Sequence, residues 1–488
     1  MSFCIQTLPM LIMAAAGLLL SGRELDRISR WNVFRAVDKF LILVPVMLNL
    51  KGNLELNLTL RMSTAVGGVS LNQSNMGELD NRRTRQTLVR GNFALLQSQA
   101  LIIACLAGAL SFLIGHDWNT TEKAVESFVS STNASTGTGT AFPSDVISSL
   151  VPRGIHLPNR PNVDRALRLR NGYLEFFMIV AVSMMSASLS SAIQGTCLCA
   201  LVVWSRRYKV DPDQCVVPFA GSLGDLTTLT ILGLLAAGMF PTEGSLLSLA
   251  LFLVLIGFCC IMVFLTLRNV YVYELFSYGW TPLFVAALIS SLAGLLLDRN
   301  AAKFDGFALL APVQSGLPGV AAAILTSTLS SNLHTGKILA PTRSSLGNYA
   351  PLNEADHRDD SHPTTNQNNQ SLKGMVSKNF SPLCGWRLPL ALLGCTTLVQ
   401  VGFLLLLWLT KSLAFGWQFA LCFTALSILL VCIALSLGYI ICLMLWYFDY
   451  DPDTSCMPYV TSLVDVLSQI LLLGTFAAAR ALGDKVHV

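Results

Sequence analysis

Long apolar runs separated by short polar segments dominate this chain. A helix that crosses about 30 Å of hydrocarbon needs about 20 predominantly apolar residues. Eleven runs approach or exceed that length, near 3–20, 40–64, 91–115, 173–204, 216–241, 245–267, 280–298, 306–332, 388–411, 417–447 and 457–480. The pattern predicts an all-α polytopic membrane protein with about 11 transmembrane helices.

The first run is the shortest and could also be a signal peptide. It begins almost at Met1 and ends at Ser21-Gly22. No positive residue precedes it, although a signal peptide normally carries such charges at its start. We therefore expect a membrane helix here.

Composition agrees with the hydropathy pattern. Only 12% of the 488 residues are charged, against about 25% in globular proteins. The 13 cysteines lie in or beside apolar runs, so neither a disulfide framework nor a zinc site is expected. A lipid bilayer is the expected surrounding, and we expect no nucleic acid, resident cofactor or obligate protein partner.

Two long polar segments interrupt the apolar pattern. Residues 116–172 carry the sequons at Asn119 and Asn133, which favour an extracytoplasmic loop, and residues 336–387 are typical of a disordered connector. Basic residues at 82–90 and 206–209 place those two loops in the cytoplasm. The basic residues that follow the first run conflict with this topology: Arg23, Arg27, Arg30, Arg35 and Lys39.

One polar motif occurs twice at a constant offset of 240 residues. The first copy contains Asp211-Pro212-Asp213, Pro218, Ser222 and Asp225, and the second contains Asp451-Pro452-Asp453, Pro458, Ser462 and Asp465. Asp225 is the only charged residue between Asp213 and Glu243, and Asp465 is the only one between Asp453 and Arg480. A carboxylate in a membrane helix costs about 2.5–3.5 kcal/mol, so a matched pair is expected to have a use.

The spacing of this motif predicts where its side chains lie. Pro218 and Pro458 suit the first turn of a helix. The serine and the second aspartate then share one helical face, about 10 Å from the start of the helix. Asp225 and Asp465 would meet at an interface, where carboxylates and hydroxyls are ligands for a hydrated divalent cation. The Asp-Pro-Asp turns would attract cations at the mouth of the pathway, or simply begin the helices.

Weaker repeats extend beyond this motif. Ala16-Gly-Leu-Leu-Leu20 recurs at 293–297, and Pro45-Val46 recurs as Pro312-Val313. We expect a five-helix half at 1–244, a connecting helix at 245–267 and a second half at 268–488. The single connecting helix would let the two halves insert in the same direction and form a pseudo-symmetric pair.

A second polar group, Lys51-Gly52-Asn53-Leu54-Glu55, interrupts the second apolar run. Gly52 would allow a close helix approach or an unwound turn. Asn53 could then offer an oxygen to an ion, or simply bond to a neighbouring helix.

These residues give the chain a specific resemblance. It resembles solute carrier family 41, the eukaryotic two-domain relatives of the bacterial MgtE magnesium channels. The similar stretches are 45–64, 211–225, 312–319 and 451–465. The resemblance implies two MgtE-like domains that transport Mg²⁺, with Asp225 and Asp465 lining the pore. It leaves Na⁺ as a possible coupling ion and makes the plasma membrane the expected location.

The chain departs from the family pattern at two places. Pro318-Gly319-Val320 stands where the family's second domain has Gly-Gly-Asn. The Ala-Gly-Leu-Leu-Leu run normally ends in Asp, which Asp298 provides in the second copy, whereas Ser21 follows the first. The expected ion-contacting residues are Asp225, Asp465, Asn53, Ser222, Ser462, Asp298, Asp211, Asp213, Asp451 and Asp453.

Three alternatives to magnesium transport remain open. The same aspartates could carry protons, or serve Na⁺-coupled movement of another solute. The chain could also be a pseudo-transporter or scaffold, given Val320. An enzyme is not expected, because the sequence contains no nucleophile–base motif and no His-Glu-x-x-His zinc motif.

Overall fold

A computed structural model gives the fold over most of the apolar sequence. It describes residues 2–37, 39–67, 82–115, 173–207, 212–242, 245–270, 272–273, 276, 280–334, 387–410, 413 and 415–483. Side chains are described throughout these ranges except at 2–6, 60–67, 82–85, 202–207, 212–223, 242, 334 and 453–454. Twelve α-helices and no strand occur in this part of the chain.

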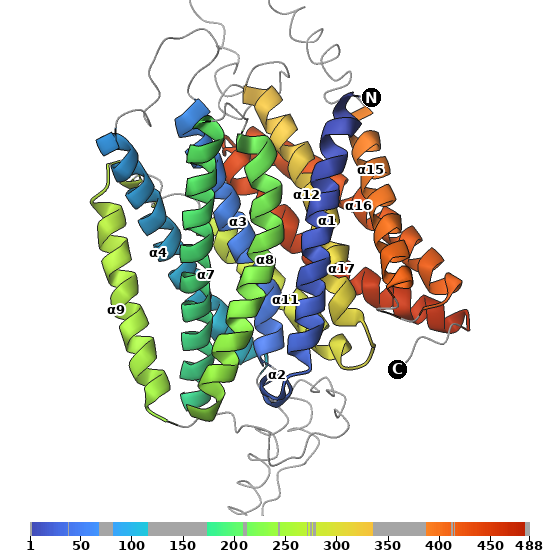
Figure 1. Cartoon of the computed structure of the whole chain (residues 1–488), viewed down its shortest axis with the longest axis horizontal. Helices are drawn as coiled ribbons and strands as arrows, with labels where there is room; N and C mark the ends of the chain where they lie inside the picture. The colour runs from blue at the N-terminus through green and yellow to red at the C-terminus, as the bar shows by residue number, and fades with distance from the viewer. Residues whose placement is uncertain are drawn as a thin grey trace, which may run out of the picture.

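The helices stand side by side in one bundle (Figure 1). The first half forms α1 (Ser2–Ser29), α2 (Asn32–Ala36), α3 (Lys39–Gly67), α4 (Arg82–Ile114), α7 (Tyr173–Arg207) and α8 (Pro212–Met239). Next come a 3-10 turn (Phe240–Thr242) and α9 (Leu247–Leu267). The second half forms α11 (Trp280–Ala301), α12 (Phe307–His334), α15 (Arg387–Leu409), α16 (Trp417–Tyr447) and α17 (Pro452–Ala481).

Membrane-spanning character is widespread in this bundle. Among the described residues, nine helices are long and apolar enough to cross a bilayer. The helices α3 and α8, with 29 and 28 residues, are not counted in these nine. They stand between those helices in the bundle (Figure 1). The chain is therefore an all-α polytopic membrane protein, as the hydropathy pattern predicted.

The first helix is longer than its apolar run. We expected it to end near residue 20, but α1 continues to Ser29. Ion pairs accompany the additional turns: within the helix Arg27 lies 3.9 Å from Glu24, and just beyond its end Arg30 lies 2.9 Å from Asp26. The apolar run ends at the charged residues. Ion pairs between residues three or four positions apart stabilise the helix beyond that point.

This extension weakens the conflict over the basic residues that follow the first run. Arg23 and Arg27 lie within α1 and Lys39 within α3, so these three are not loop residues. Lys39 is buried and its Nζ lies 2.5 Å from Glu175 Oε1. Only Arg30 and Arg35 lie in the short connection between the two long helices.

The packing of the first half recurs in the second. The pairs α3–α8, α7–α8, α4–α7 and α3–α7 correspond to α12–α17, α16–α17, α15–α16 and α12–α16. The two halves also exchange one helix each. In addition to α8 of its own half, α1 packs against α12 and α15 of the second half. In addition to α17 of its own half, α11 packs against α3 and α4 of the first half. The boundaries 1–244, 245–267 and 268–488 remain a prediction.

Two glycines let these exchanged helices approach closely. A Cβ atom at Gly22 would overlap the carbonyl oxygen of Leu309, and a Cβ atom at Gly294 would overlap that of Ile42. The alignment of Pro45 with Pro312 makes Ile42 and Leu309 equivalent. Gly22 and Gly294 therefore occupy equivalent positions in the two repeats.

This equivalence corrects the repeat register expected for α1 and α11. It aligns Gly22-Arg-Glu-Leu-Asp-Arg27 with Gly294-Leu-Leu-Leu-Asp-Arg299. Asp26, and not Ser21, is then the counterpart of Asp298. The repeated Ala-Gly-Leu-Leu-Leu run was misleading because its small and apolar residues match in several registers. An aspartate is therefore present in both copies.

The helix α9 lies outside this symmetry. It packs against α4 and α7 at one edge of the bundle and leaves most of its surface exposed (Figure 1). In the second half no helix of the described chain occupies the corresponding place beside α15 and α16.

Candidate ion pathway between the two halves

A cavity of about 420 Å³ lies between the two halves. Its walls come from α1, α3 and α8 of the first half and from α11, α12 and α17 of the second. Equivalent leucines of the exchanged helices, Leu25 and Leu297, both line it. Its polar lining residues are Asn49, Asn53, Glu55, Thr59, Asp225, Ser315, Thr326, Ser327, Thr328, Thr461, Asp465 and Gln469.

The repeated aspartates both line this cavity. Asp225 lies on α8 and Asp465 on α17, which are equivalent helices of the two halves. The structure therefore brings together two carboxylates from sequence segments that are 240 residues apart.

The aspartates lie deeper than the sequence suggested. We expected Pro458 in the first turn, but α17 already begins at Pro452, and Pro458 lies inside the helix. Pro452 suits this start because the first helical position needs no backbone N–H. At 1.5 Å per residue, Asp465 lies about 20 Å along α17 rather than about 10 Å. That depth is near the middle of a bilayer.

Amide and hydroxyl groups surround Asp465. Asn49 Nδ2 donates a hydrogen bond of 2.7 Å to Asp465 Oδ2. Asn53 Nδ2 donates to Asn49 Oδ1 and, at 3.3 Å, to Thr461 Oγ1. Thr461 Oγ1 also lies 3.3 Å from Asn49 Oδ1. This network connects α3 of the first half with α17 of the second.

The glycine beside this network does not serve the purpose we expected. The helix α3 runs without interruption from Lys39 to Gly67, so Gly52 makes no unwound turn. No atom lies within 4 Å of a Cβ atom built on Gly52, so it mediates no close helix contact either. Gly52 instead lines the cavity, as do Gly319 and Val320 of the second repeat.

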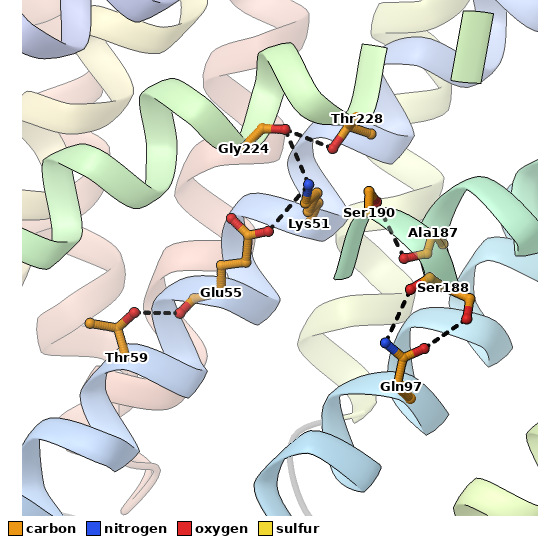
Figure 2. A network of polar contacts seen from close by, with 9 residues as sticks. All are labelled: Lys51, Glu55, Thr59, Gln97, Ala187, Ser188, Ser190, Gly224 and Thr228. Atoms are coloured by element: carbon orange, nitrogen blue, oxygen red, sulfur yellow. Dashed lines mark hydrogen bonds and ion pairs between the residues drawn. The ribbon is translucent and has the colours of Figure 1, made fainter. Parts of the chain in front are cut away.

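An ion pair is buried next to Asp225. Lys51 Nζ lies 3.4 Å from Glu55 Oε1 and donates a hydrogen bond of 3.1 Å to the carbonyl oxygen of Gly224. The Lys51 and Glu55 residues are only 4% and 1% exposed. Figure 2 shows Lys51 between the Glu55 carboxylate and the Gly224 carbonyl, which also accepts a bond from Thr228.

A separate polar pair in Figure 2 joins two helices away from the cavity. Gln97 Nε2 donates to the carbonyl oxygen of Ser188 at 3.1 Å, and Ser188 Oγ donates to Gln97 Oε1 at 2.8 Å. Neither residue lines the cavity. Ser427 and Gln314 make a similar bond of 2.8 Å between α16 and α12. These pairs hold helices together.

Several expected ion-contacting residues lie elsewhere. Ser462 is buried, donates to the carbonyl oxygen of Tyr459 and does not line the cavity. Asp298 is buried in α11 next to the lining residue Leu297, and Asp451 is exposed just before α17. Asp211 and the side chains of Asp213, Ser222 and Asp453 lie outside the described residues.

Ser462 lies off the cavity because of the rotation of α17, whereas the side chain of Ser222 lies outside the described residues. Thr461, four residues before Asp465, shares its face of the cavity, whereas Ser462 points toward its own helix. Spacings of three and four residues both place side chains on one helix face, so the motif alone could not choose between them. Asn49, four residues before Asn53, was missed although the same spacing indicated it.

In the part of the chain that the structure describes, no three His, Cys, Asp or Glu side chains gather closely enough to hold a metal ion.

Comparison with known proteins gives one family. The MgtE model, described as divalent cation transporter, matches residues 44–235 and 311–475. Solute carrier family 41 member 3 of Rattus norvegicus is 26% identical over 479 residues, which cover 96% of this chain and 85% of that protein. Member 2 of Homo sapiens is 26% identical over 498 residues, with 99% and 71% covered. No solved structure matches the chain.

Proposed function

Because this chain belongs to the MgtE family of divalent cation transporters, we propose that it carries Mg²⁺ through the cavity between its two halves. The observation that carries the proposal is the meeting of Asp225 and Asp465 in one cavity. A carboxylate at this depth in a membrane helix is costly unless it has a partner. A passing cation supplies that partner for both.

The size of the cavity suits a hydrated ion. Mg²⁺ gives up its water reluctantly and is usually held with several waters in place. Six waters occupy roughly 180 Å³ at about 30 Å³ each. The cavity of about 420 Å³ accommodates such an ion between the polar side chains that line it. Asn49, Asn53 and Thr461 would contact the water shell through their oxygen atoms.

A multi-pass protein of this family works in a membrane, and we propose the plasma membrane as that place.

Of the predicted residues, Asp225, Asp465 and Asn53 belong to the proposed pathway. Asp211, Asp213, Asp451 and Asp453 would attract cations toward its mouth.

Uptake of isotopic Mg²⁺ by cells that lack their own magnesium transport tests the proposal. Asp225→Asn and Asp465→Asn should each lower the initial uptake rate at least about tenfold, which corresponds to about 1.4 kcal/mol. Asp305→Asn is the control, because Asp305 is exposed and does not line the cavity.

Three results would count against the proposal. Absence of uptake by the wild-type protein would favour a scaffold. Normal uptake by both aspartate variants at equal surface expression would remove the carboxylates from the pathway. Uptake of another solute that depends on Na⁺ or H⁺, without Mg²⁺ uptake, would favour the coupled transporter.

A further inference from the structure

The buried pair Lys51–Glu55 lies beside the cavity, and of the two residues only Glu55 lines it. Its ammonium group lies against α8, bonded to the carbonyl oxygen of the residue that precedes Asp225. The absence of a side chain at Gly224 leaves room for this arrangement, because a Cβ atom there would lie 2.7 Å from Glu55 Oε2. The chain therefore holds a fixed positive charge beside one of its two repeated carboxylates.

The other carboxylate has a different environment. Asp465 is bonded to Asn49, and Asn53 and Thr461 complete a neutral network around it. Amide, hydroxyl and carboxylate oxygens are the ligands that hard divalent cations prefer. The Asp465 side of the cavity thus offers oxygen atoms, whereas an ammonium group lies beside Asp225.

This asymmetry is specific to α3 and has no counterpart in α12. The alignment of Pro45 with Pro312 pairs each polar residue of α3 with a residue of α12 that has neither an amide nor a charged side chain. The residues aligned with Asn49, Lys51, Asn53 and Glu55 are Gly316, Pro318, Val320 and Ala322. In the described chain the contact between α17 and α3 is likewise more extensive than that between α8 and α12. The carboxylates are repeated, but their surroundings are not.

The fixed charges also limit how many ions fit. Beside a cation, the ionised forms of Glu55, Asp225 and Asp465 together with Lys51 carry a net charge of −2. One divalent cation neutralises this charge, whereas two would leave an uncompensated charge of +2 in a medium of low dielectric constant.

We propose that the cavity binds one divalent cation on its Asp465 side, and that Lys51 is the positioning residue that prevents a second cation from binding at Asp225. This inference rests on the proposed function and adds the position and the number of ions to it. Lys51 acts through its charge and touches no substrate.

Titration of the purified full-length protein in lipid nanodiscs with Mg²⁺ tests the number and the position. Calorimetry should give one ion per chain. Asp465→Asn should weaken binding at least about tenfold, and Asp225→Asn clearly less. Asn53→Val should also weaken binding, while the matched control Asn92→Val, at a buried amide of α4 that does not line the cavity, should leave it within about twofold.

Variants of the ion pair test the role of Lys51. Lys51→Met makes the net charge more negative, from −2 to −3. Mg²⁺ should therefore bind more tightly and cross the membrane more slowly in a liposome flux assay. The double variant Lys51→Met/Glu55→Gln restores the charge of −2 with neutral side chains of similar size. The Mg²⁺ affinity and the Mg²⁺ flux should then both return to within about threefold of the wild-type values. The double variant also serves if Lys51→Met alone fails to fold.

Two ions per chain, or equal losses for Asp225→Asn and Asp465→Asn, would overturn the inference. A double variant as altered as Lys51→Met would show that Lys51 has only a structural role. Each of these results leaves the proposed function intact if the wild-type protein still transports Mg²⁺. Absence of Mg²⁺ flux through the wild type overturns the proposed function itself.

Discussion

At the scale of the residue, polar side chains inside this bundle fall into two groups with different surroundings. Asp225, Asp465 and Asn53 line a cavity. Lys39 and Glu175 instead form a closed pair between α3 and α7, with Lys39 Nζ also 5.2 Å from the centre of the Phe112 ring. The first group suits transport, and the second stabilises the fold.

The closed pair gives a prediction about stability. Removal of one partner from a buried ion pair costs about 3–5 kcal/mol, because the remaining charge is left uncompensated. Lys39→Met should therefore lower the unfolding temperature in fluorescence-detected chromatography, and Lys39→Met/Glu175→Gln should recover part of the loss. Arg30→Met is the control, since its pair with Asp26 is largely exposed and such pairs contribute about 0–1 kcal/mol. Equal losses for Lys39→Met and Arg30→Met would contradict this interpretation.

The sequence could identify the aspartates but not their neighbours. The aspartates were visible because a lone charge in an apolar run is rare, and this one occurs twice. Thr461 was missed because its contribution depends on the rotation of α17 about its axis. No helix periodicity fixes that rotation when most faces of a helix are apolar.

At the scale of the element, the exchange of α1 and α11 between the halves determines how closely the helices pack. Each of these helices crosses a helix of the opposite half at a glycine, Gly22 or Gly294. Apolar runs predicted that α1 and α11 exist but could not predict this exchange. The contact depends on backbone atoms of Leu309 and Ile42, which any sequence would provide.

A methyl group at these crossings should separate the two halves. Gly294→Ala places a Cβ atom against the backbone of Ile42, which cannot move aside as a side chain can. Such overpacking typically costs about 1–3 kcal/mol, so the unfolding temperature and the yield of folded protein should fall.

A glycine in open surroundings provides the matched control for this prediction. No atom lies within 4 Å of a Cβ atom built on Gly402 in α15, so Gly402→Ala should leave the unfolding temperature unchanged or raise it slightly. Equal behaviour of the two variants would mean that the crossing is looser than described.

At the scale of the whole molecule, alternation of the long helices determines which segments face the same side. The end of α4 and the start of α7 lie at one end of the bundle, and the end of α12 and the start of α15 lie at the other (Figure 1). The helix α9 makes this possible, because it returns the chain to the end of the bundle from which the second half begins. Hydropathy predicted the helices, and this sidedness follows from their alternation.

This arrangement predicts the accessibility of inserted epitope tags. A tag within 116–172 should be labelled on intact cells, because the sequons there indicate an extracytoplasmic segment. A tag within 336–387 should be labelled only after permeabilisation. A tag within 68–81, between α3 and α4, is the control and should behave like the second. Labelling of the first two tags from the same side would contradict the alternation.

The exchange of α1 also bears on how the chain is made. Its partners α12 and α15 leave the ribosome long after α1 has entered the membrane, since α12 begins only at Phe307. Until then the face of α1 that will meet them is open to lipid or to the insertion machinery. A product truncated before α12 would keep that face uncovered, and cellular quality control would therefore meet it as an unfinished protein rather than as a working half.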